Sequence, residues 1–335
     1  MNKRSSYIIA MALMLLMFVS CVPRYGKYWL SVAAPEEGGR RLDKITYAED
    51  LVDTDARFAV SMDGTKIAFT SWKTGNGDIY VKSLTGGRAL LQRTYRPETE
   101  HAPSFSPDGT KLAFHALRDG HFHIYMVGAE SGMAIQQITT NTPADALNPV
   151  FSPDGNFIAF NSVDFVFNPQ TGKYEYVPNS EIIWTYDLAT GRLTQYTSGL
   201  MPRYTADGKK IIFKRAAKTG AGYYGLWMMD IATGAETEII AGTDFGIWDY
   251  DISPDGSKIV FSSDKSTGLN PRELKNANLW VVNIDGTGLT QLTYHLSNDL
   301  RPVWAPDMTG IYFLSCRGEQ NKEIMNIWRM NYESK

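Results

Sequence analysis

A turn signature recurs six times along the chain and constrains its fold more than any other feature. In five copies a hydroxyl residue is followed, two and three positions later, by aspartate and glycine; the sixth reads Ala305-Pro306-Asp307-Met308. The six aspartates are Asp63, Asp108, Asp154, Asp207, Asp255 and Asp307. Their separations of roughly 45 to 53 residues indicate a repeat architecture with one supersecondary unit per repeat.

Each repeat has the pattern of four β-strands. The Asp-Gly pair is expected to supply the positive-φ positions of a tight hairpin that joins two antiparallel strands. A short apolar strand follows each turn, and a third strand carries a large aromatic residue that we expect in the core. These aromatics are Tyr80, Tyr125, Trp184, Trp227, Trp280 and Trp328. With a weaker fourth strand per repeat, the pattern predicts an all-β, six-bladed β-propeller over residues 42–335.

The sixth repeat contains three of its four strands, and the missing one is expected near the N-terminus. Residues 42–47, Leu-Asp-Lys-Ile-Thr-Tyr, match the fourth-strand pattern Leu-Thr-Gln-Leu-Thr-Tyr of residues 289–294. We therefore expect residues 42–47 to pair with the strand around Trp328, which would close blade 6 as an N-terminal velcro strand and leave no open sheet edge.

The first 21 residues have the pattern of a targeting segment. Lys3 and Arg4 precede an apolar run over residues 7–19, which is followed by Ser20 and Cys21. This resembles a bacterial lipoprotein signal peptide over residues 1–20, with Cys21 as the lipidated, palmitate-bearing first residue of the mature chain and residues 21–41 as a tether. Phe18 departs from the usual leucine, so an uncleaved anchor or a plain secretory peptide stays open. Cys316 then lacks a cysteine partner, which excludes a disulfide framework.

The repeat itself resembles a known family. Ser-Pro-Asp-Gly followed by an apolar strand and then Ile-Tyr or Leu-Trp is similar to the TolB-type, WD-like propeller repeat of bacterial envelope proteins, over about residues 42–332. The resemblance implies a fold and an envelope location, but it does not fix a function. TolB carries an N-terminal α/β domain ahead of its propeller, which we expect to be absent here. Prolyl-oligopeptidase-like peptidases share the repeat, but the sequence has no Gly-x-Ser-x-Gly nucleophile elbow.

Loop lengths indicate which end of the blades is adapted for function. We define the X end of a blade as the end at which its second strand finishes and its third begins, and the Y end as the end with the Asp-Gly turn. The longest X-end connections belong to blades 3 and 5. Residues 270–276 of blade 5 are expected to form either one helical turn or an irregular loop.

The blade 3 insertion, residues 164–177, is expected to be a protruding hairpin. Its alternation places Phe165 and Phe167 on one face, and does the same for Tyr174 and Tyr176. Such an aromatic stripe suits a polypeptide or glycan ligand. The alternative is that the hairpin folds down onto its own propeller.

A second candidate site lies at the channel mouth, where the innermost strands begin. The expected binding residues there are Arg57, Asn148, Arg203, Asp249, Asp251 and Arg301. They could form a charged funnel for an acidic group, a cation or a peptide terminus. Internal salt bridges around a water-filled channel are the alternative.

Four of the five histidines belong to blade 2 and are weak candidates for a metal site. His101, His115, His121 and His123 all fall towards the X end, where three converging imidazoles could bind zinc, manganese or copper. They lie on successive strands, however, so exposed histidines without a metal are the expectation. No cofactor is predicted.

The sequence thus favours a lipid-anchored, monomeric envelope propeller on the periplasm-facing side of the outer membrane, which binds a protein or peptide partner without catalysis. The alternative is a propeller enzyme on acidic glycans, lyase-like or sialidase-like, with its site at the channel mouth. The formal net charge of -3 lacks the positive field that nucleic-acid binding requires, so no nucleic-acid partner is expected.

Overall fold

The computed structural model describes residues 40–53, 57–87, 90–130, 134–140, 144–171, 173–216, 223–241, 245–265, 276–295, 297–319, 321 and 324–333. The predicted signal peptide, the lipidation site Cys21 and nearly all of the blade 5 insertion lie outside these ranges. The described ranges contain no helix with the length and apolar character needed to span a bilayer.

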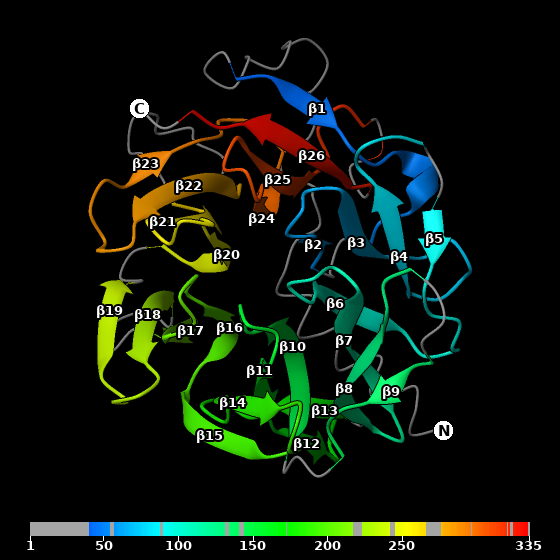
Figure 1. Cartoon of the computed structure of the whole chain (residues 1–335), viewed down its shortest axis with the longest axis vertical. Helices are drawn as coiled ribbons and strands as arrows, with labels where there is room; N and C mark the ends of the chain where they lie inside the picture. The colour runs from blue at the N-terminus through cyan, green and yellow to red at the C-terminus, as the bar shows by residue number, and fades with distance from the viewer. Residues whose placement is uncertain are drawn as a thin grey trace. The chain divides into compact units, whose positions relative to one another are not determined.

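The chain folds into six four-stranded antiparallel sheets, as predicted for a six-bladed propeller (Figure 1). From innermost to outermost strand, blade 1 consists of β2 (Ala59–Val60), β3 (Lys66–Ser71), β4 (Asp78–Ser83) and β5 (Leu90–Gln92). Blade 2 consists of β6 (Glu100–Phe105), β7 (Lys111–Arg118), β8 (His121–Gly128) and β9 (Gln136–Gln137). Blade 3 consists of β10 (Asp145–Phe151), β11 (Phe157–Val163), β14 (Ile182–Asp187) and β15 (Leu193–Ser198).

The remaining blades follow the same order. Blade 4 consists of β16 (Leu200–Tyr204), β17 (Lys210–Ala216), β18 (Tyr224–Asp230) and β19 (Glu236–Ile240). Blade 5 consists of β20 (Ile247–Ile252), β21 (Lys258–Ser263), β22 (Asn278–Asn283) and β23 (Thr290–Gln291). Blade 6 consists of β24 (Asp299–Trp304), β25 (Gly310–Ser315), β26 (Asn326–Asn331) and β1 (Leu42–Lys44). The elements outside the blades are the hairpin β12 (Phe165–Asn168) and β13 (Lys173–Tyr176) and the short 3-10 helix η1 (Ala48–Asp50).

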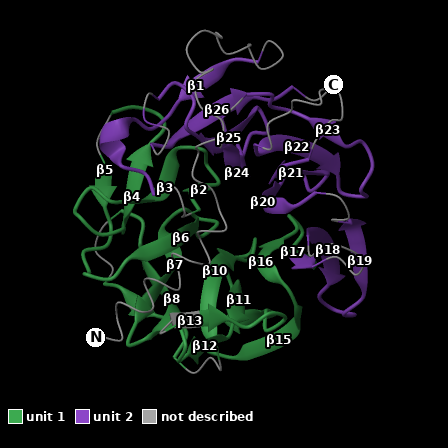
Figure 2. Cartoon of the chain, turned by 180° about the vertical axis from the view of Figure 1, so that it is seen from behind, with its two compact units in different colours: residues 1–19, 55–213 green, residues 20–54, 214–335 purple. Residues whose placement is uncertain are grey.

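The described chain forms two compact units (Figure 2). Unit 1 contains blades 1, 2 and 3, and unit 2 contains blades 5 and 6 together with the segment from residue 40 to residue 53. The boundary at residues 213 and 214 falls inside β17 of blade 4.

The core of each blade is built from its second and third strands. The second strands contribute a fully buried phenylalanine in every repeat, namely Phe69, Phe114, Phe160, Phe213, Phe261 and Phe313. Four of the predicted third-strand aromatics are buried, and Trp184 and Trp328 are half-buried. The prediction that these aromatics pack in the core is therefore confirmed for blades 1, 2, 4 and 5 and holds in part for blades 3 and 6.

The turn signature works through its hydroxyl and its carboxylate. In blade 1 the Ser61 hydroxyl donates to Asp63 Oδ1 (2.5 Å) and accepts from the Lys66 N–H (2.9 Å), while Gly64 N–H donates to the Ser61 carbonyl (2.8 Å). Gly64 has φ +69°, whereas Asp63 is outside the positive-φ region. The expectation that both Asp and Gly have positive φ was therefore wrong, because the i to i+3 hydrogen bond needs a left-handed residue only at the last position.

The sixth turn keeps this geometry without glycine. Met308 N–H donates to the Ala305 carbonyl (2.9 Å) and Met308 has φ 60°. Thr309 N–H and Oγ1 both donate to Asp307 Oδ1, at 3.0 and 2.8 Å. The carboxylate thus holds the turn while a methionine takes the strained position.

The N-terminal segment pairs where the sequence predicts. Leu42, Asp43 and Lys44 of β1 face Met330, Arg329 and Trp328 of β26 in antiparallel register. Beyond β1, the buried Thr46 hydroxyl accepts from the Ile327 N–H at 2.8 Å. The same bond joins Thr94 to Ile79, Thr139 to Ile124 and Thr293 to Leu279 in blades 1, 2 and 5. Residues 42–46 therefore occupy the fourth-strand position of blade 6.

Candidate functional site

The predicted channel-mouth positions coincide with irregularities in the innermost strands. The β-ladder shifts register between His101 and Ser104 in β6, and at the corresponding points of β10, β20 and β24. Six residues before the turn aspartate, the backbone has a positive φ of 52° to 56° at four non-glycine positions, namely Ala102, Asn148, Met201 and Arg301. Such strained residues persist only where the surrounding contacts fix them.

In unit 1, side chains of the second strands form hydrogen bonds with the irregular segments of the innermost strands, in the same blade or in the next one. Asn161 Oδ1 accepts from the Met201 N–H (3.0 Å) and from Asn148 Nδ2 (3.0 Å). His115 Nδ1 accepts from the Asn148 N–H (3.4 Å). The predicted binding residue Asn148 is thus fixed on both its backbone and its side chain, by residues on two different blades.

A buried basic cluster lies beside these contacts. Arg57 Nη2 contacts Met201 Sδ at 3.0 Å, and the His101 and His115 rings stack with centroids 5.6 Å apart. Burial, with His101 and then Arg57 as smaller causes, holds the pKa of His115 well below its usual value. A neutral His115 agrees with its role as acceptor. The expectation of exposed histidines was wrong for His101 and His115, because the inner end of blade 2 covers both.

In unit 2, the predicted channel residues bind one another. Arg301 Nη1 lies 3.2 Å from Asp249 Oδ2, and both side chains are largely buried. Asp251 Oδ2 accepts from the Trp304 N–H at 2.9 Å, which ties β20 to β24. These contacts agree with internal pairing of the funnel charges. Arg203, in unit 1, lies half-buried on β16.

The other two histidines lie at the X end of blade 2. His121 Nδ1 lies 3.5 Å from the buried Asp145 Oδ1, and the His121 and His123 rings are 6.4 Å apart. Among the residues that the structure describes, no three histidine, cysteine, aspartate or glutamate side chains are grouped to hold a metal ion. The Cys316 thiol is fully buried and forms no disulfide within the described residues.

Two buried ion pairs were not predicted. Glu100 Oε1 lies 3.0 Å from Arg118 Nη2 in blade 2, and Asp299 Oδ2 lies 2.5 Å from Arg317 Nη2 in blade 6. Burial raises the pKa of Glu100 to about 7, although hydrogen bonds from Thr94 and Arg118 oppose the shift. In both repeats the acid stands eight residues before the turn aspartate and the arginine ten after it, a spacing that would have revealed the pairs.

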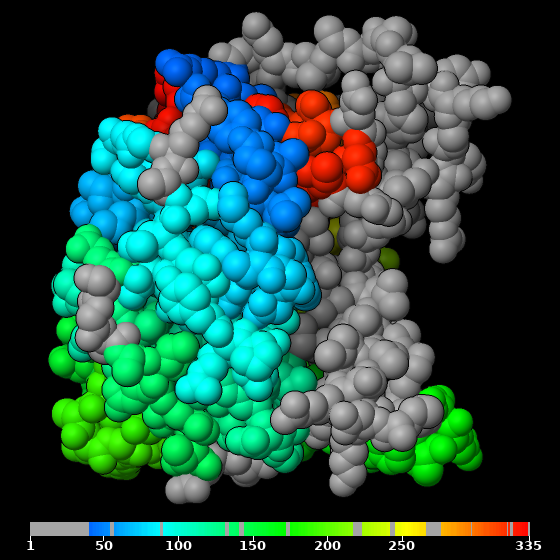
Figure 3. Space-filling view, turned by 90° about the vertical axis from the view of Figure 1, so that its right-hand side faces the viewer, coloured from blue at the N-terminus to red at the C-terminus, as the bar shows by residue number. Residues whose placement is uncertain are grey.

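The blade 3 insertion forms the predicted hairpin. β12 and β13 make a two-stranded sheet of their own, with Phe165 opposite Tyr176 and Phe167 opposite Tyr174. Directly opposite residues share a face of an antiparallel pair, so Phe165 and Tyr176 lie on the same face of the hairpin. The hairpin belongs to the bright green lobe at the lower right of Figure 3.

Exposed apolar side chains gather at the X ends of the blades. In unit 1 the exposed large apolar residues on X-end segments are Trp72, Tyr95, Val166 and Phe167, and in unit 2 they are Tyr47, Leu51 and Tyr294. Those elsewhere in the described residues are Met62, Leu91, Phe157 and Leu289. The distribution is asymmetric, as the loop lengths predicted.

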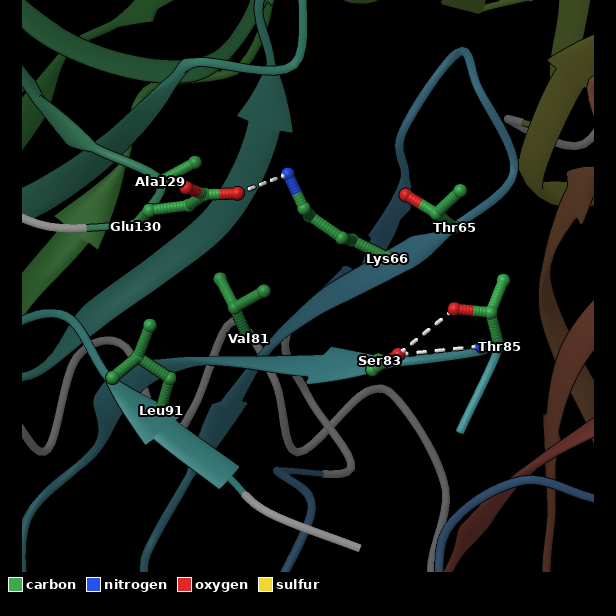
Figure 4. A pocket seen from close by; sticks show the side chains of 8 residues that line it. All are labelled: Thr65, Lys66, Val81, Ser83, Thr85, Leu91, Ala129 and Glu130. Carbon is green, nitrogen blue, oxygen red and sulfur yellow. Dashed lines mark hydrogen bonds and ion pairs between the residues drawn. The ribbon is translucent and has the colours of Figure 1, made fainter. Parts of the chain in front are cut away.

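A cavity of about 530 Å³ lies at the opposite, Y end of blades 1 and 2 (Figure 4). Lys66 Nζ and Glu130 Oε1 form an ion pair of 2.7 Å in its wall, and this pairing lowers the pKa of Glu130. Val81 and Leu91 give it an apolar side. The sequence did not predict this cavity, because Glu130 comes from the neighbouring blade.

Comparison with known proteins agrees with this architecture. Residues 31–176 match the TolB beta propeller domain. A putative TolB from Agrobacterium tumefaciens superposes with a TM-score of 0.56 at 21% identity, over 84% of this chain and 92% of that one. Residues 31–176 thus carry a TolB-type propeller repeat, and the chain has the six-bladed propeller fold. TolB from Acinetobacter baumannii superposes with a TM-score of 0.57 at 24% identity, over 76% of this chain and 59% of that one.

Two enzymes are also similar to this chain, one in structure and one in part of its sequence. An oligogalacturonate lyase from Vibrio parahaemolyticus superposes with a TM-score of 0.54 at 13% identity, over 88% of this chain and 97% of that one. Identity at this level shows the fold alone. Dipeptidyl-peptidase 5 from Porphyromonas gingivalis is 26% identical over 150 residues, which cover 43% of this chain. The matched region spans 20% of the length of that curated relative.

Proposed function

We propose that this TolB-type propeller is a lipid-anchored, non-catalytic binding module of the cell envelope. It takes a protein or peptide partner at the X ends of its blades and acts as a monomer on the periplasm-facing side of the outer membrane. The observation that carries the proposal is the gathering of exposed apolar side chains at those ends, Trp72, Tyr95 and Phe167 among them. Exposed apolar clusters on a folded protein mark interaction surfaces.

The polar residues of the inner strands support binding over catalysis. Catalytic sites need titratable groups that reach a substrate. Here the Arg301 and Asp249 side chains pair with each other, Asp251 accepts a backbone N–H, and His115 is buried and accepts from Asn148. These side chains bind other residues of the propeller and fix the positions of its strands.

The anchoring half of the proposal rests on Lys3, Arg4, the apolar run before Ser20, and Cys21. Cys21→Ser should abolish incorporation of a palmitate analogue and release the protein from the membrane fraction. A C21S protein that stays membrane-bound after a salt wash would refute anchoring by lipid at this residue.

The binding half is tested by site-specific photo-crosslinking in intact cells. A photoreactive amino acid at Trp72 or Tyr95 should yield a discrete crosslinked product, whereas the same group at Met62 or Phe157, at the Y ends, should not. Products from Y-end positions alone, or from none of the four, would overturn the assignment. Turnover of an acidic glycan by the purified protein would favour the enzymatic alternative instead.

A further inference from the structure

The β12–β13 hairpin is ordered by its own side chains. At its tip, Glu175 Oε1 accepts from Asn168 Nδ2 (2.8 Å) and Thr171 Oγ1 (3.0 Å), and Asn168 Oδ1 accepts from the Gln170 N–H (2.8 Å). At its base, the Asp164 carbonyl accepts from the Val177 N–H at 2.9 Å. An arm fixed in this way loses little conformational entropy when a partner binds it.

This ordered arm carries large apolar side chains that remain accessible to solvent. Val166 is 58% exposed and Phe167 is 47% exposed, although folding normally covers residues of this kind. The register places Val166 opposite Glu175 on one face, and Phe167 with Phe165 and Tyr176 on the other. The Phe165 and Tyr176 rings meet edge to face, 6.4 Å apart, and stiffen the aromatic face at the base.

Exposed carboxylates lie at the base of the arm and near its tip. Asp164 at the hairpin base and Glu175 near its tip are both exposed, and Asp164 is close enough to Asp145 to raise the pKa of that buried carboxyl, whose largest perturbation is burial. The exposed Asp119 adds a carboxylate at the X end of blade 2. A surface of this charge attracts a cationic partner, in the same way that complementary potentials steer protein association.

We infer that the hairpin and the adjoining X end of blade 2 form a docking surface for a polypeptide segment that combines a large apolar side chain with flanking lysines or arginines. The apolar side chain packs against Phe167 and Val166. The basic residues lie against Asp164, Glu175 and Asp119. This deepens the proposed function, on which it rests, by naming the chemistry of the partner.

The test is peptide selection on the full chain, purified in detergent. A phage-displayed library of random peptides is selected on the wild type, and an enriched peptide is synthesised for binding measurements. We expect the enriched peptides to join an aromatic or aliphatic residue to several lysines or arginines. F167S should weaken binding by about tenfold or more, and D164K by about five- to tenfold at low salt, with the D164K effect shrinking as salt is added.

The matched control is Phe157→Ser, which removes a 37% exposed aromatic at the Y end of the same blade. It should leave peptide binding unchanged, and thermal melts should show that all three variants fold. Enriched peptides that are acidic, that bind F167S and wild type equally, or that do not exceed a bare-support background would overturn the inference. Persistent crosslinks from Trp72 or Tyr95 in that case would show that the proposed function stands while the hairpin assignment fails.

Discussion

The bond between Thr46 and Ile327 offers a direct test of how the N-terminal strand stabilises the propeller. Both residues are fully buried, and the Thr46 hydroxyl accepts from the Ile327 N–H at 2.8 Å. Thr46→Val keeps the shape of the side chain and deletes the acceptor. The Ile327 N–H is then left buried without a partner, which costs about 1–3 kcal/mol of unfolding free energy.

The assay is urea unfolding followed by tryptophan fluorescence, because Trp328 lies opposite Lys44 in the β1–β26 pair. In a thermal melt, the same loss of unfolding free energy corresponds to a drop in Tm of several degrees. Thr293→Val is the matched control, since Thr293 makes the equivalent 2.9 Å bond to Leu279 within blade 5, where the fourth strand follows the third directly in sequence.

If β1 is an integral fourth strand, the two variants lose similar stability, and deletion of residues 41–50 lowers the Tm of the whole propeller by more than either. A Thr46→Val protein as stable as the wild type, beside a clearly weakened Thr293→Val protein, would refute the reasoning. A deletion variant with an unchanged melting curve would do the same.

Three further outcomes follow from the turns and from Glu100. Met308→Gly should stabilise the protein by about 1 kcal/mol, because glycine adopts the φ of 60° without strain. Gly208→Ala, at φ +68°, should destabilise the protein by a similar amount. A denaturation midpoint equal to that of the wild type, for either variant, would contradict this. Burial raises the pKa of Glu100 to about 7, so the folded state binds the proton of this carboxyl more tightly than the unfolded state does. The free energy of unfolding should therefore fall by up to about 3 kcal/mol as pH rises from about 4.5 to 7. Glu100→Gln should remove this dependence on pH. Hydrogen bonds from the Ser61 and Ser106 hydroxyls and from nearby N–H groups lower the pKa values of Asp63 and Asp108 to about 2. The two carboxylates should therefore stabilise the folded state above about pH 4, and this stabilisation should be lost as pH falls towards 2. A double variant with Asp63→Asn and Asp108→Asn should unfold in acid with a shallower dependence on pH.

The repeat pattern predicted the blades because every blade has the same local structural requirements. Glycine or its substitute is needed at one left-handed turn position, and an apolar second strand must be buried on both faces. The match between residues 42–47 and 289–294 worked for the same reason, since Thr46 and Thr293 accept the same third-strand hydrogen bond. Local chemistry that recurs in each blade can be predicted from one sequence.

The candidate site was harder to predict because it depends on differences between blades. The spacing from the turn aspartate placed Asn148 at the channel mouth, but the register shift and the left-handed φ at this position change where its backbone and side chain point. The hydrogen bond from the Met201 N–H to Asn161 joins blades 4 and 3, so no pattern within one repeat contains it. Only the hairpin, whose strands are neighbours in sequence, was predictable in detail.

The two unpredicted ion pairs place an acid and an arginine at the same repeat positions of blades 2 and 6. Glu100 pairs with Arg118 in blade 2 and Asp299 pairs with Arg317 in blade 6, and burial raises the pKa of Glu100 to about 7. A buried acid is costly unless its charge is compensated, and Arg118 also lies 3.9 Å from the Tyr125 ring centroid, so its cation is shared between carboxylate and ring. The charged form of Glu100 is therefore less favoured in blade 2 than the charged form of a glutamate in water. Because Glu100 and Arg118 lie at the X end of blade 2, which belongs to the surface that we propose for docking, we expect the charge at this end of the blade to change as pH rises through about 7.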